Sequence, residues 1–113
     1  MRAKARSAFG SRSMIYEIDF LTAAKKEWDG LDPAIRGQFK KKLEKLRYEP
    51  RVPAGKLRGH PDRYKIKLRS AGFRLVYEVQ DAVLVILVIG VGKREGEAVY
   101  RAAARRSAGP ADG

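Results

Sequence analysis

The sequence RYKIKLRSAGFRLVYE, residues 63–78, decides the fold because it alternates basic with apolar side chains, turns, and alternates again. Alternation with a period of two is typical of a half-buried strand, since successive side chains point to opposite faces. Two such runs joined by a short loop that ends in glycine predict a β-hairpin, with Ala71 and Gly72 as its loop. That loop would place Leu68 opposite Leu75.

The predicted hairpin has one apolar face and one cationic face. In the register of a two-residue loop, Ile66 faces Tyr77 on the apolar side, and Glu78 faces and neutralises Lys65 on the other. The second face carries four cations: Lys65, Lys67, Arg69 and Arg74. A slip of one residue would bury these cations, so the pattern fixes which face is which. A flat cationic surface backed by a core suits an extended polyanion.

Composition narrows the classes of function. The 113 residues allow one compact domain. The chain has no cysteine and one histidine, His60, which excludes a disulfide framework, a thiolate metal site and a paired-histidine nuclease site. Its 25 Lys and Arg against 13 Asp and Glu give a net charge of +12. Such a surplus indicates nucleic acid, an anionic membrane surface or an acidic protein partner, although a merely soluble charged surface is the plain alternative.

The sequence predicts a single domain without a membrane segment. No apolar run reaches the roughly 18 residues that a membrane span needs, and the first residues lack the apolar core of a secretory signal. We therefore expect a cytoplasmic protein that does not contact membranes. Residues 1–13 are expected to form a flexible basic extension, residues 14–106 the domain, and residues 107–113 a disordered tail, with Met14 as an alternative start.

Two helices are predicted to follow a first strand at residues 14–20. Thr22 is placed to cap a short helix that runs through Trp28 to Gly30. Asp32 followed by Pro33 predicts the start of a second helix, which must end before Pro50. Its apolar stripe has i, i+4 spacing: Ile35, Phe39, Leu43 and Leu46. We expect the two helices to form a hairpin packed on one side of the sheet.

The last third of the chain completes an α+β fold. Residues 50–62 are rich in proline and glycine and predict an irregular loop. Residues 83–91 are almost wholly apolar and predict a central strand covered on both faces. A short helix is expected to start at Glu95 and to contain Tyr100. The predicted order is strand, helix, helix, strand, strand, strand, helix around a small, mostly antiparallel sheet.

Five segments, taken in order, closely resemble the RelE toxins. They are Ala24–Trp28, Lys56–Gly59, Tyr64–Arg69, Gly72–Tyr77 and Val91–Glu95, with Tyr100 following them. The resemblance runs from about residue 14 to residue 106. It implies a RelE-like fold and a ribosome-dependent mRNA interferase, which cleaves mRNA in the ribosomal A site beside 16S rRNA without a metal or cofactor. It also implies neutralisation by a RelB-like antitoxin, with operator DNA contacted only through the antitoxin complex.

The resemblance also implies which residues act. The lysines of the family's Lys-x-Lys strand match Lys65 and Lys67, and its further catalytic positions match Arg74, Arg94 and Tyr100. We assign RNA or ribosome binding to six more cations: Arg58, Arg69, Lys56, Lys93, Lys40 and Lys41. For the last two, a solvated face of an amphipathic helix is the ordinary role.

Elementary chemistry is consistent with these assignments. A metal-free ribonuclease needs a base for the 2′-hydroxyl, charge stabilisation at phosphorus and an acid for the 5′-oxygen. A lysine crowded by other cations gives up its proton more readily, so Lys67 is the candidate base. Arg74 and Arg94 suit the scissile phosphate, because a guanidinium can donate two hydrogen bonds to it, and Arg94 is also a candidate donor to the leaving oxygen. Tyr100 offers a ring for base stacking. His60, in its Pro-Gly loop, is expected to be incidental.

The same residues also fit plainer roles. An ordinary solvated face accounts for Lys65 and Lys67, and helix packing accounts for Tyr100. Two further classes of function compete with the nuclease: a non-catalytic toxin resembling the ParE toxins, which bind DNA gyrase on the same fold, and a plain RNA-binding module. The plain module would lose affinity steeply with salt and would cut nothing.

Overall fold

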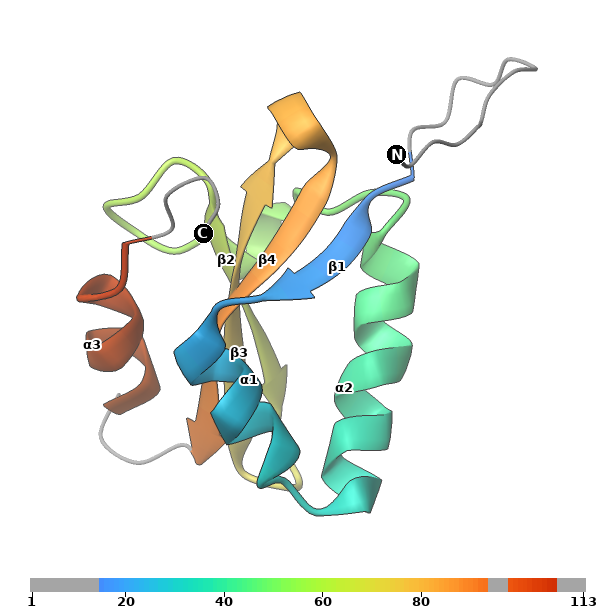
Figure 1. Ribbon diagram of the computed structural model, residues 1–113, viewed down its shortest axis with the longest axis vertical. Helices are drawn as coiled ribbons and strands as arrows, with labels where there is room; N and C mark the ends of the chain where they lie inside the picture. Colours follow the sequence, from blue (N-terminus) through green and yellow to red (C-terminus); the bar gives the residue numbers. More distant parts are fainter. Residues whose placement is uncertain (1–14, 94–97, 108–113) are drawn as a thin grey trace.

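The computed structural model describes residues 15–93 and 98–107 (Figure 1). The elements occur in the predicted order: β1 Glu17–Phe20, α1 Thr22–Asp29, α2 Pro33–Leu46, β2 Arg63–Leu68, β3 Phe73–Gln80, β4 Val85–Lys93 and α3 Ala98–Ala104, with short 3-10 turns at Pro53–Gly55 and Asp81–Val83. None of the helices described is long and apolar enough to cross a membrane.

The four strands form one sheet in the order β1-β4-β3-β2. Only β1 and β4 are parallel, so the mostly antiparallel α+β fold is confirmed. The apolar run does form a central strand, but β4 starts at Val85 rather than at Val83. The preceding 3-10 turn is followed by Leu84, whose φ of 54° turns the backbone out of the strand conformation.

The hairpin of β2 and β3 forms, but the predicted register is wrong by two residues. Leu68 pairs with Phe73, so the loop contains the four residues 69–72 instead of Ala71 and Gly72 alone. The Gly72 amide donates a hydrogen bond to the Leu68 carbonyl at 2.8 Å, and Gly72 itself has φ of +72°. The longer loop gives the left-handed position to glycine and spares Ala71 a conformation that it tolerates poorly.

Because the shift is an even number of residues, each side chain keeps its predicted face, but cross-strand partners change. Glu78 pairs with Arg63, and Lys65 lies opposite Val76. The expected neutralisation of Lys65 by Glu78 is therefore wrong.

The helical hairpin packs on one face of the sheet, as predicted. Ala24 of α1 and Phe39 and Leu43 of α2 are almost completely buried in a core with the apolar face of the hairpin. Thr22 does not cap α1; it is the first helical residue, and Leu21 occupies the cap position. Asp32 precedes Pro33 at the start of α2 as expected, although its side chain makes no capping hydrogen bond.

Helix α3 packs on the opposite face of the sheet, so the chain forms three layers (Figure 1). Val99 and Ala103 of α3 are buried against Val76, Leu87 and Ile89. This helix covers part of the face that the sequence predicted to be a flat cationic surface. The cations beside it therefore border a helix rather than an open plane.

Candidate catalytic surface

Three of the predicted catalytic cations project from the hairpin on the side of α3. Lys67 of β2 lies directly opposite Arg74 of β3, and Lys65 lies opposite Val76. Side chains of directly opposite residues share a face and have Cβ atoms about 4.5–5.5 Å apart. Lys67 is exposed, whereas Lys65 and Arg74 are half-buried. The hairpin therefore presents an accessible lysine beside a guanidinium.

Tyr100 of α3 lies against Arg74. The Arg74 Cζ atom is 4.8 Å from the centroid of the Tyr100 ring, which is the geometry of a cation–π contact. Tyr100 also packs against the apolar cluster beneath α3. One face of its ring is thus occupied by Arg74, so stacking of an RNA base on Tyr100 requires the other face. We name Lys65, Lys67, Arg74 and Tyr100 the catalytic surface.

The Arg74 guanidinium has unused hydrogen-bonding capacity. Its Nε atom is buried and has no hydrogen-bond partner within the described part of the chain. A buried donor left unsatisfied costs about 1–3 kcal/mol, more when the group is charged. Arg74 as a whole is half-buried, and guanidinium groups that are accessible bind phosphate with parallel hydrogen bonds.

The strand that leads to Arg94 runs beside Arg74. Gly92 of β4 lies directly opposite Arg74, while Arg94 itself falls outside the described residues. A Cβ atom at Gly92 would lie 3.3 Å from a Val99 methyl group. Glycine at this position therefore permits the close approach of α3 to the sheet beside Arg74. Sequence reasoning missed this role, although glycine between Val91 and Lys93 in a strand is a known sign of close packing.

Of the six predicted binding cations, four lie in the loop before the hairpin, in the hairpin turn or at the end of β4. Arg58 and Lys56 are exposed in that loop, Arg69 is exposed in the hairpin turn, and Lys93 is exposed at the end of β4. The other two, Lys40 and Lys41, are exposed on α2. Because α2 and α3 cover opposite faces of the sheet, the structure does not bring that pair to the catalytic surface.

His60 lies in the loop before β2 and makes hydrogen bonds within that loop. Its Nδ1 atom accepts a hydrogen bond from the Asp62 amide at 3.1 Å, and its Nε2 atom is 3.6 Å from Glu78. The Lys56 ammonium donates to the His60 carbonyl at 3.0 Å. These contacts give His60 a structural role in ordering the loop.

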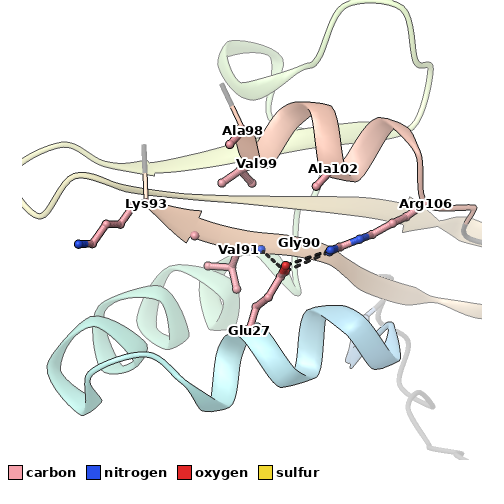
Figure 2. A pocket seen from close by; sticks show the side chains of 9 residues that line it. Glu27, Gly90, Val91, Lys93, Ala98, Val99, Ala102 and Arg106 are labelled. Atoms are coloured by element: carbon pink, nitrogen blue, oxygen red, sulfur yellow. Dashed lines mark hydrogen bonds and ion pairs between the residues drawn. The ribbon is translucent and has the colours of Figure 1, made fainter. Parts of the chain in front are cut away.

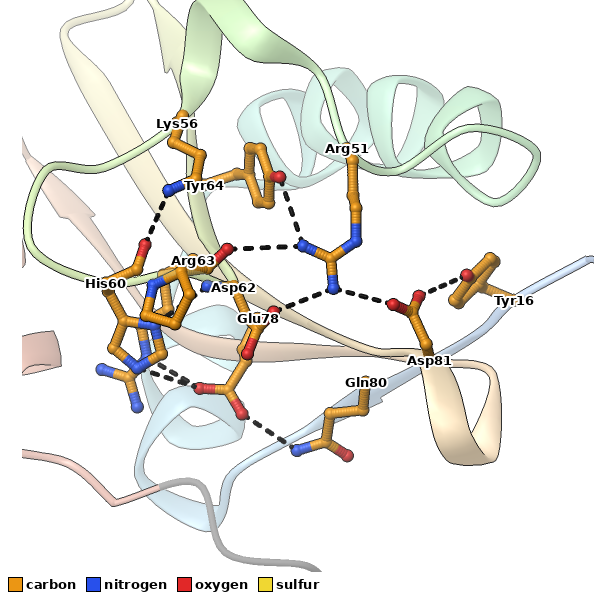
Figure 3. Close-up of polar contacts among 11 residues, drawn as sticks. Tyr16, Arg51, Lys56, His60, Asp62, Arg63, Tyr64, Glu78, Gln80 and Asp81 are labelled. Carbon is orange, nitrogen blue, oxygen red and sulfur yellow. Dashed lines mark hydrogen bonds and ion pairs between the residues drawn. The ribbon is translucent and has the colours of Figure 1, made fainter.

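Arg63 is a residue of interest that sequence reasoning did not single out. Its Nε atom donates to Glu78 at 2.9 Å, and its two Nη atoms donate to the carbonyls of Ala103 at 2.7 Å and Arg106 at 2.8 Å (Figure 3 shows the contact with Glu78). It thus joins β2 to the end of α3. The alternation at residues 63, 65 and 67 was the available signal, but the wrong register hid its pairing with Glu78.

A second ion pair joins the end of α3 to α1 (Figure 2). Arg106 donates to both carboxylate oxygens of Glu27, at 3.0 and 2.9 Å, and to the Ile89 carbonyl at 2.8 Å. Burial raises the pKa of Glu27, but hydrogen bonds from Arg106 and from the Val91 amide lower it more, so that its pKa falls below the ordinary value. The pair lies along the edge of β4 beyond the end of β1.

A shallow cavity of about 280 Å³ lies between α1, β4 and α3 (Figure 2). It is lined by Glu27, Gly90, Val91, Gly92, Lys93, Ala98, Val99, Ala102 and Arg106. None of the four residues of the catalytic surface lines it. The catalytic surface is therefore separate from this hollow.

Comparison with known proteins identifies the family. Residues 18–97 match the family model described as ParE toxin of type II toxin–antitoxin system, parDE. The chain belongs to the RelE/ParE family of toxins. Two curated relatives are the mRNA interferase toxin RelE of Escherichia coli strain K12 and the mRNA interferase RelE of Shigella flexneri. Each is 54% identical over 93 residues, which is 82% of this chain and 98% of the relative.

Solved RelE structures have the same fold. A double mutant of the E. coli toxin RelE in the free state is 53% identical, with a TM-score of 0.77 over 82% of this chain and 98% of that chain. The toxin in the intact E. coli RelBE toxin–antitoxin complex is 55% identical, with a TM-score of 0.68 over 71% of this chain and 98% of that chain. The RelE resemblance and the RelE-like fold predicted from the sequence are confirmed.

A polar network fastens the other end of the hairpin in this RelE-family toxin (Figure 3). Arg51 donates to Asp62 and to Asp81, each at 2.9 Å, and the Tyr16 hydroxyl donates to Asp81 at 2.6 Å. Burial and the hydrogen bond to Asp81 raise the pKa of Tyr16 to about 12. The network ties the start of β1 and the end of β3 to the loop after α2, and it fixes the hairpin on which the catalytic surface stands.

Proposed function

We propose that this toxin cuts mRNA in the ribosomal A site, with Lys67 as general base and Arg74 as a phosphate ligand. The protein is a toxin of a type II toxin–antitoxin system and an endoribonuclease that cleaves mRNA, in line with 54% identity to two mRNA interferases over 82% of the chain. The observation that carries the proposal is the pairing of Lys67 with Arg74, whose guanidinium rests on Tyr100.

The proposed reaction is attack of the 2′-oxygen on the adjacent phosphorus atom. Lys67 accepts the 2′-hydroxyl proton, the new P–O2′ bond forms, and the P–O5′ bond breaks. The products are a 2′,3′-cyclic phosphate and a 5′-hydroxyl. Arg74 lies directly across the hairpin from Lys67. Arg94 is the proposed donor of the proton that the 5′-oxygen needs.

Arg74 is proposed to stabilise the charge that develops on the phosphorane. The partial exposure of Arg74 supports this role, because a guanidinium that RNA can reach binds phosphate with charge-assisted hydrogen bonds. Tyr100 is proposed first to support Arg74 through the 4.8 Å ring contact and second to stack a base on its other face. Lys65 is proposed to add positive potential beside the phosphate.

Dependence on the ribosome follows from the residue types. The catalytic surface offers no carboxylate or imidazole as base, so the reaction depends on strict orientation of the 2′-hydroxyl. We propose that the ribosome supplies that orientation in the cytoplasm. Arg58, Arg69, Lys56 and Lys93, together with Lys40 and Lys41 on the far face, are proposed to contact mRNA and 16S rRNA.

An antitoxin partner is proposed on similar grounds. The E. coli RelBE complex joins a RelE toxin to its antitoxin, and this chain is similar to that toxin. We propose a RelB-like antitoxin with an acidic, largely disordered segment that folds as it covers the catalytic surface, since a chain of charge +12 needs such a cover. Operator DNA is proposed to be contacted only through this complex.

The test compares ribosome-bound with free mRNA. Purified toxin should cut a codon placed in the A site, leave the cyclic phosphate, and cut naked mRNA of the same sequence poorly. Chelation of divalent metal after the ribosomes are assembled and stabilised should leave the chemical step unchanged. Equally fast cleavage of naked mRNA would refute ribosome dependence, and binding without any cleavage would favour a non-catalytic toxin.

A further inference from the structure

We propose that Arg63, paired with Glu78, is a positioning residue for the catalytic surface: it sets the distance between Tyr100 on α3 and the strand that carries Lys65 and Lys67. This inference rests on the proposed function. Arg63 contacts no predicted catalytic side chain in the described structure and is too buried to bind RNA, with its side chain only 7% exposed. Its effect on cleavage would therefore be exerted through α3.

Arg63 is unusual in its burial. It is the one polar or charged residue that is buried in the described part of the chain. A buried charge is tolerated only when it is paired and its hydrogen bonds are satisfied. Each guanidinium nitrogen of Arg63 donates one hydrogen bond: Nε to Glu78, and the two Nη atoms to the carbonyls of Ala103 and Arg106. All three guanidinium nitrogens are thus engaged by contacts within the protein.

Two of these three contacts go to the last turn of α3, at Ala103, and to Arg106 just after it. The last carbonyls of a helix lack partners within the helix and carry partial negative charge, so a cation there is stabilising. The described part of helix α3 has seven residues, Ala98–Ala104, and a helical segment this short is not stable alone. Its described buried apolar residues are Val99 and Ala103. Hydrogen bonds from Arg63 therefore help to fix the position of α3, together with this apolar packing and the Arg106–Glu27 pair.

The position of α3 determines the position of the Tyr100 ring. Ala103 follows Tyr100 by three residues, so the two lie on neighbouring turns of the same side of the helix. Arg63, Lys65 and Lys67 alternate along β2 and point to the face on which α3 lies. Strand β2 thus carries both Arg63, which contacts the end of α3, and Lys67, the proposed base. A shift of α3 would move the Tyr100 ring away from Arg74, which it now meets at 4.8 Å.

The first test separates rate from binding. Arg63→Met keeps much of the side-chain length and removes the three hydrogen bonds. We expect its single-turnover cleavage on saturating ribosomes to fall about 10- to 100-fold, because displacement of a catalytic group by about 1 Å has effects of this size. The concentration of ribosomes that gives half-maximal rate should stay within about twofold, since the exposed cations remain. Arg63→Lys should recover part of the rate.

A double-mutant cycle shows whether Arg63 acts through Tyr100. If it does, adding Arg63→Met to the Tyr100→Ala toxin should slow cleavage no further. The ring that Arg63 holds in place is already absent from that toxin. Full, multiplicative loss in the double variant would overturn the inference. Arg36→Met is a matched control, since Arg36 also donates to backbone carbonyls, those of Asp29 and Leu31, but in the helical hairpin. It should leave the rate unchanged.

A measurement that does not depend on cleavage, made on milder variants, tests the inference even when Arg63→Met folds poorly. Glu78→Gln keeps Arg63 but removes the carboxylate charge that holds its Nε atom at 2.9 Å, so the guanidinium is free to turn away from the two carbonyls. In toxin labelled with fluorotyrosine, Glu78→Gln and Arg63→Lys should each shift or broaden the Tyr100 resonance. The resonance of buried Tyr77 should stay in place. An unchanged Tyr100 resonance in Glu78→Gln and in Arg63→Lys would overturn the inference. Absence of cleavage by the wild-type toxin would instead refute the proposed function.

Discussion

Removal of the carboxylate charge at Glu27 should destabilise the toxin more at neutral pH than in acid. Glu27 accepts two hydrogen bonds from Arg106 and one from the Val91 amide. Buried hydrogen bonds to charged groups contribute about 1.5–3 kcal/mol, and exposed ion pairs about 0.2–1 kcal/mol. The Arg106 and Glu27 side chains are 22% and 36% exposed, between these limits. We therefore expect Glu27→Gln to lower the free energy of unfolding by about 1 kcal/mol, or Tm by about 4–8 °C.

The sign of the pH dependence follows from the lowered pKa of Glu27. Because its pKa in the folded protein lies below the ordinary value of 4.5, the unfolded chain binds more protons as the solution becomes acidic. The stabilisation is present above about pH 4.5 and is lost as the pH falls through the folded-state pKa. The difference between wild type and Glu27→Gln should therefore be smaller at pH 3 than at pH 7.

The measurement is urea unfolding at pH 7 and pH 3, followed by the fluorescence of Trp28. This is the one tryptophan in the sequence, and its ring packs 5.1 Å from that of Phe20. Glu44→Gln is the matched control, since Glu44 pairs with Arg47 at 2.9 Å but is 49% exposed. It should change stability by a few tenths of a kcal/mol at most. An equal deficit of Glu27→Gln at both pH values, or none at pH 7, would refute the reasoning.

Further predictions concern the core, the ring beneath Arg74 and the partner. Phe39→Ala should lower the free energy of unfolding by about 3–5 kcal/mol in urea titrations, because Phe39 is fully buried; a loss below about 1 kcal/mol would contradict the packing. Tyr100→Phe should retain most of the single-turnover cleavage that Tyr100→Ala loses, because the ring that supports Arg74 remains; equal losses would assign the role to the hydroxyl. An antitoxin segment that folds as an amphipathic helix and competes for the surface under α3 should increase hydrogen exchange at residues 98–106 when it binds. Unchanged exchange at these residues would mean that the antitoxin inhibits the toxin only by covering the catalytic surface.

The sequence was sufficient for the element order and for the faces of the hairpin. Both depend on periodicity: the alternation at residues 63–78 and the i, i+4 stripe of α2 are set by where side chains must point to be buried. The same logic placed the 83–91 run in the middle of the sheet. These patterns survive small errors in loops, because burial of an entire face outweighs the conformation of one turn.

The register could not be obtained this way. Loops of two and four residues at 69–72 leave the same side chains buried, so the hydrophobic pattern does not distinguish them. The conformational limits of Ala71 decide between them, and that small effect changed the partner of Glu78 from Lys65 to Arg63. Because the predicted register was wrong, the role of Arg63 could not be predicted either.

The position of α3 was also beyond the sequence. Its short apolar pattern indicates a helix but not which face of the sheet it covers. Its placement depends on long-range contacts, from Arg63 to the Ala103 carbonyl and from Arg106 to Glu27, whose partners lie 40 and 79 residues apart. The contact of Tyr100 with Arg74 follows from that placement. Periodicity alone would have assigned Tyr100 to packing.

The most direct test of the central claim is the single-turnover rate of Lys67→Ala on ribosomes that carry a cleavable codon in the A site. We predict that cleavage falls by at least about 100-fold, as expected for loss of a general base, while ribosome affinity stays close to wild type. Lys42→Ala, at an exposed lysine of α2, is the control and should cut at the wild-type rate. Cleavage by Lys67→Ala at the wild-type rate, or a parallel loss of binding and cleavage, would contradict the claim.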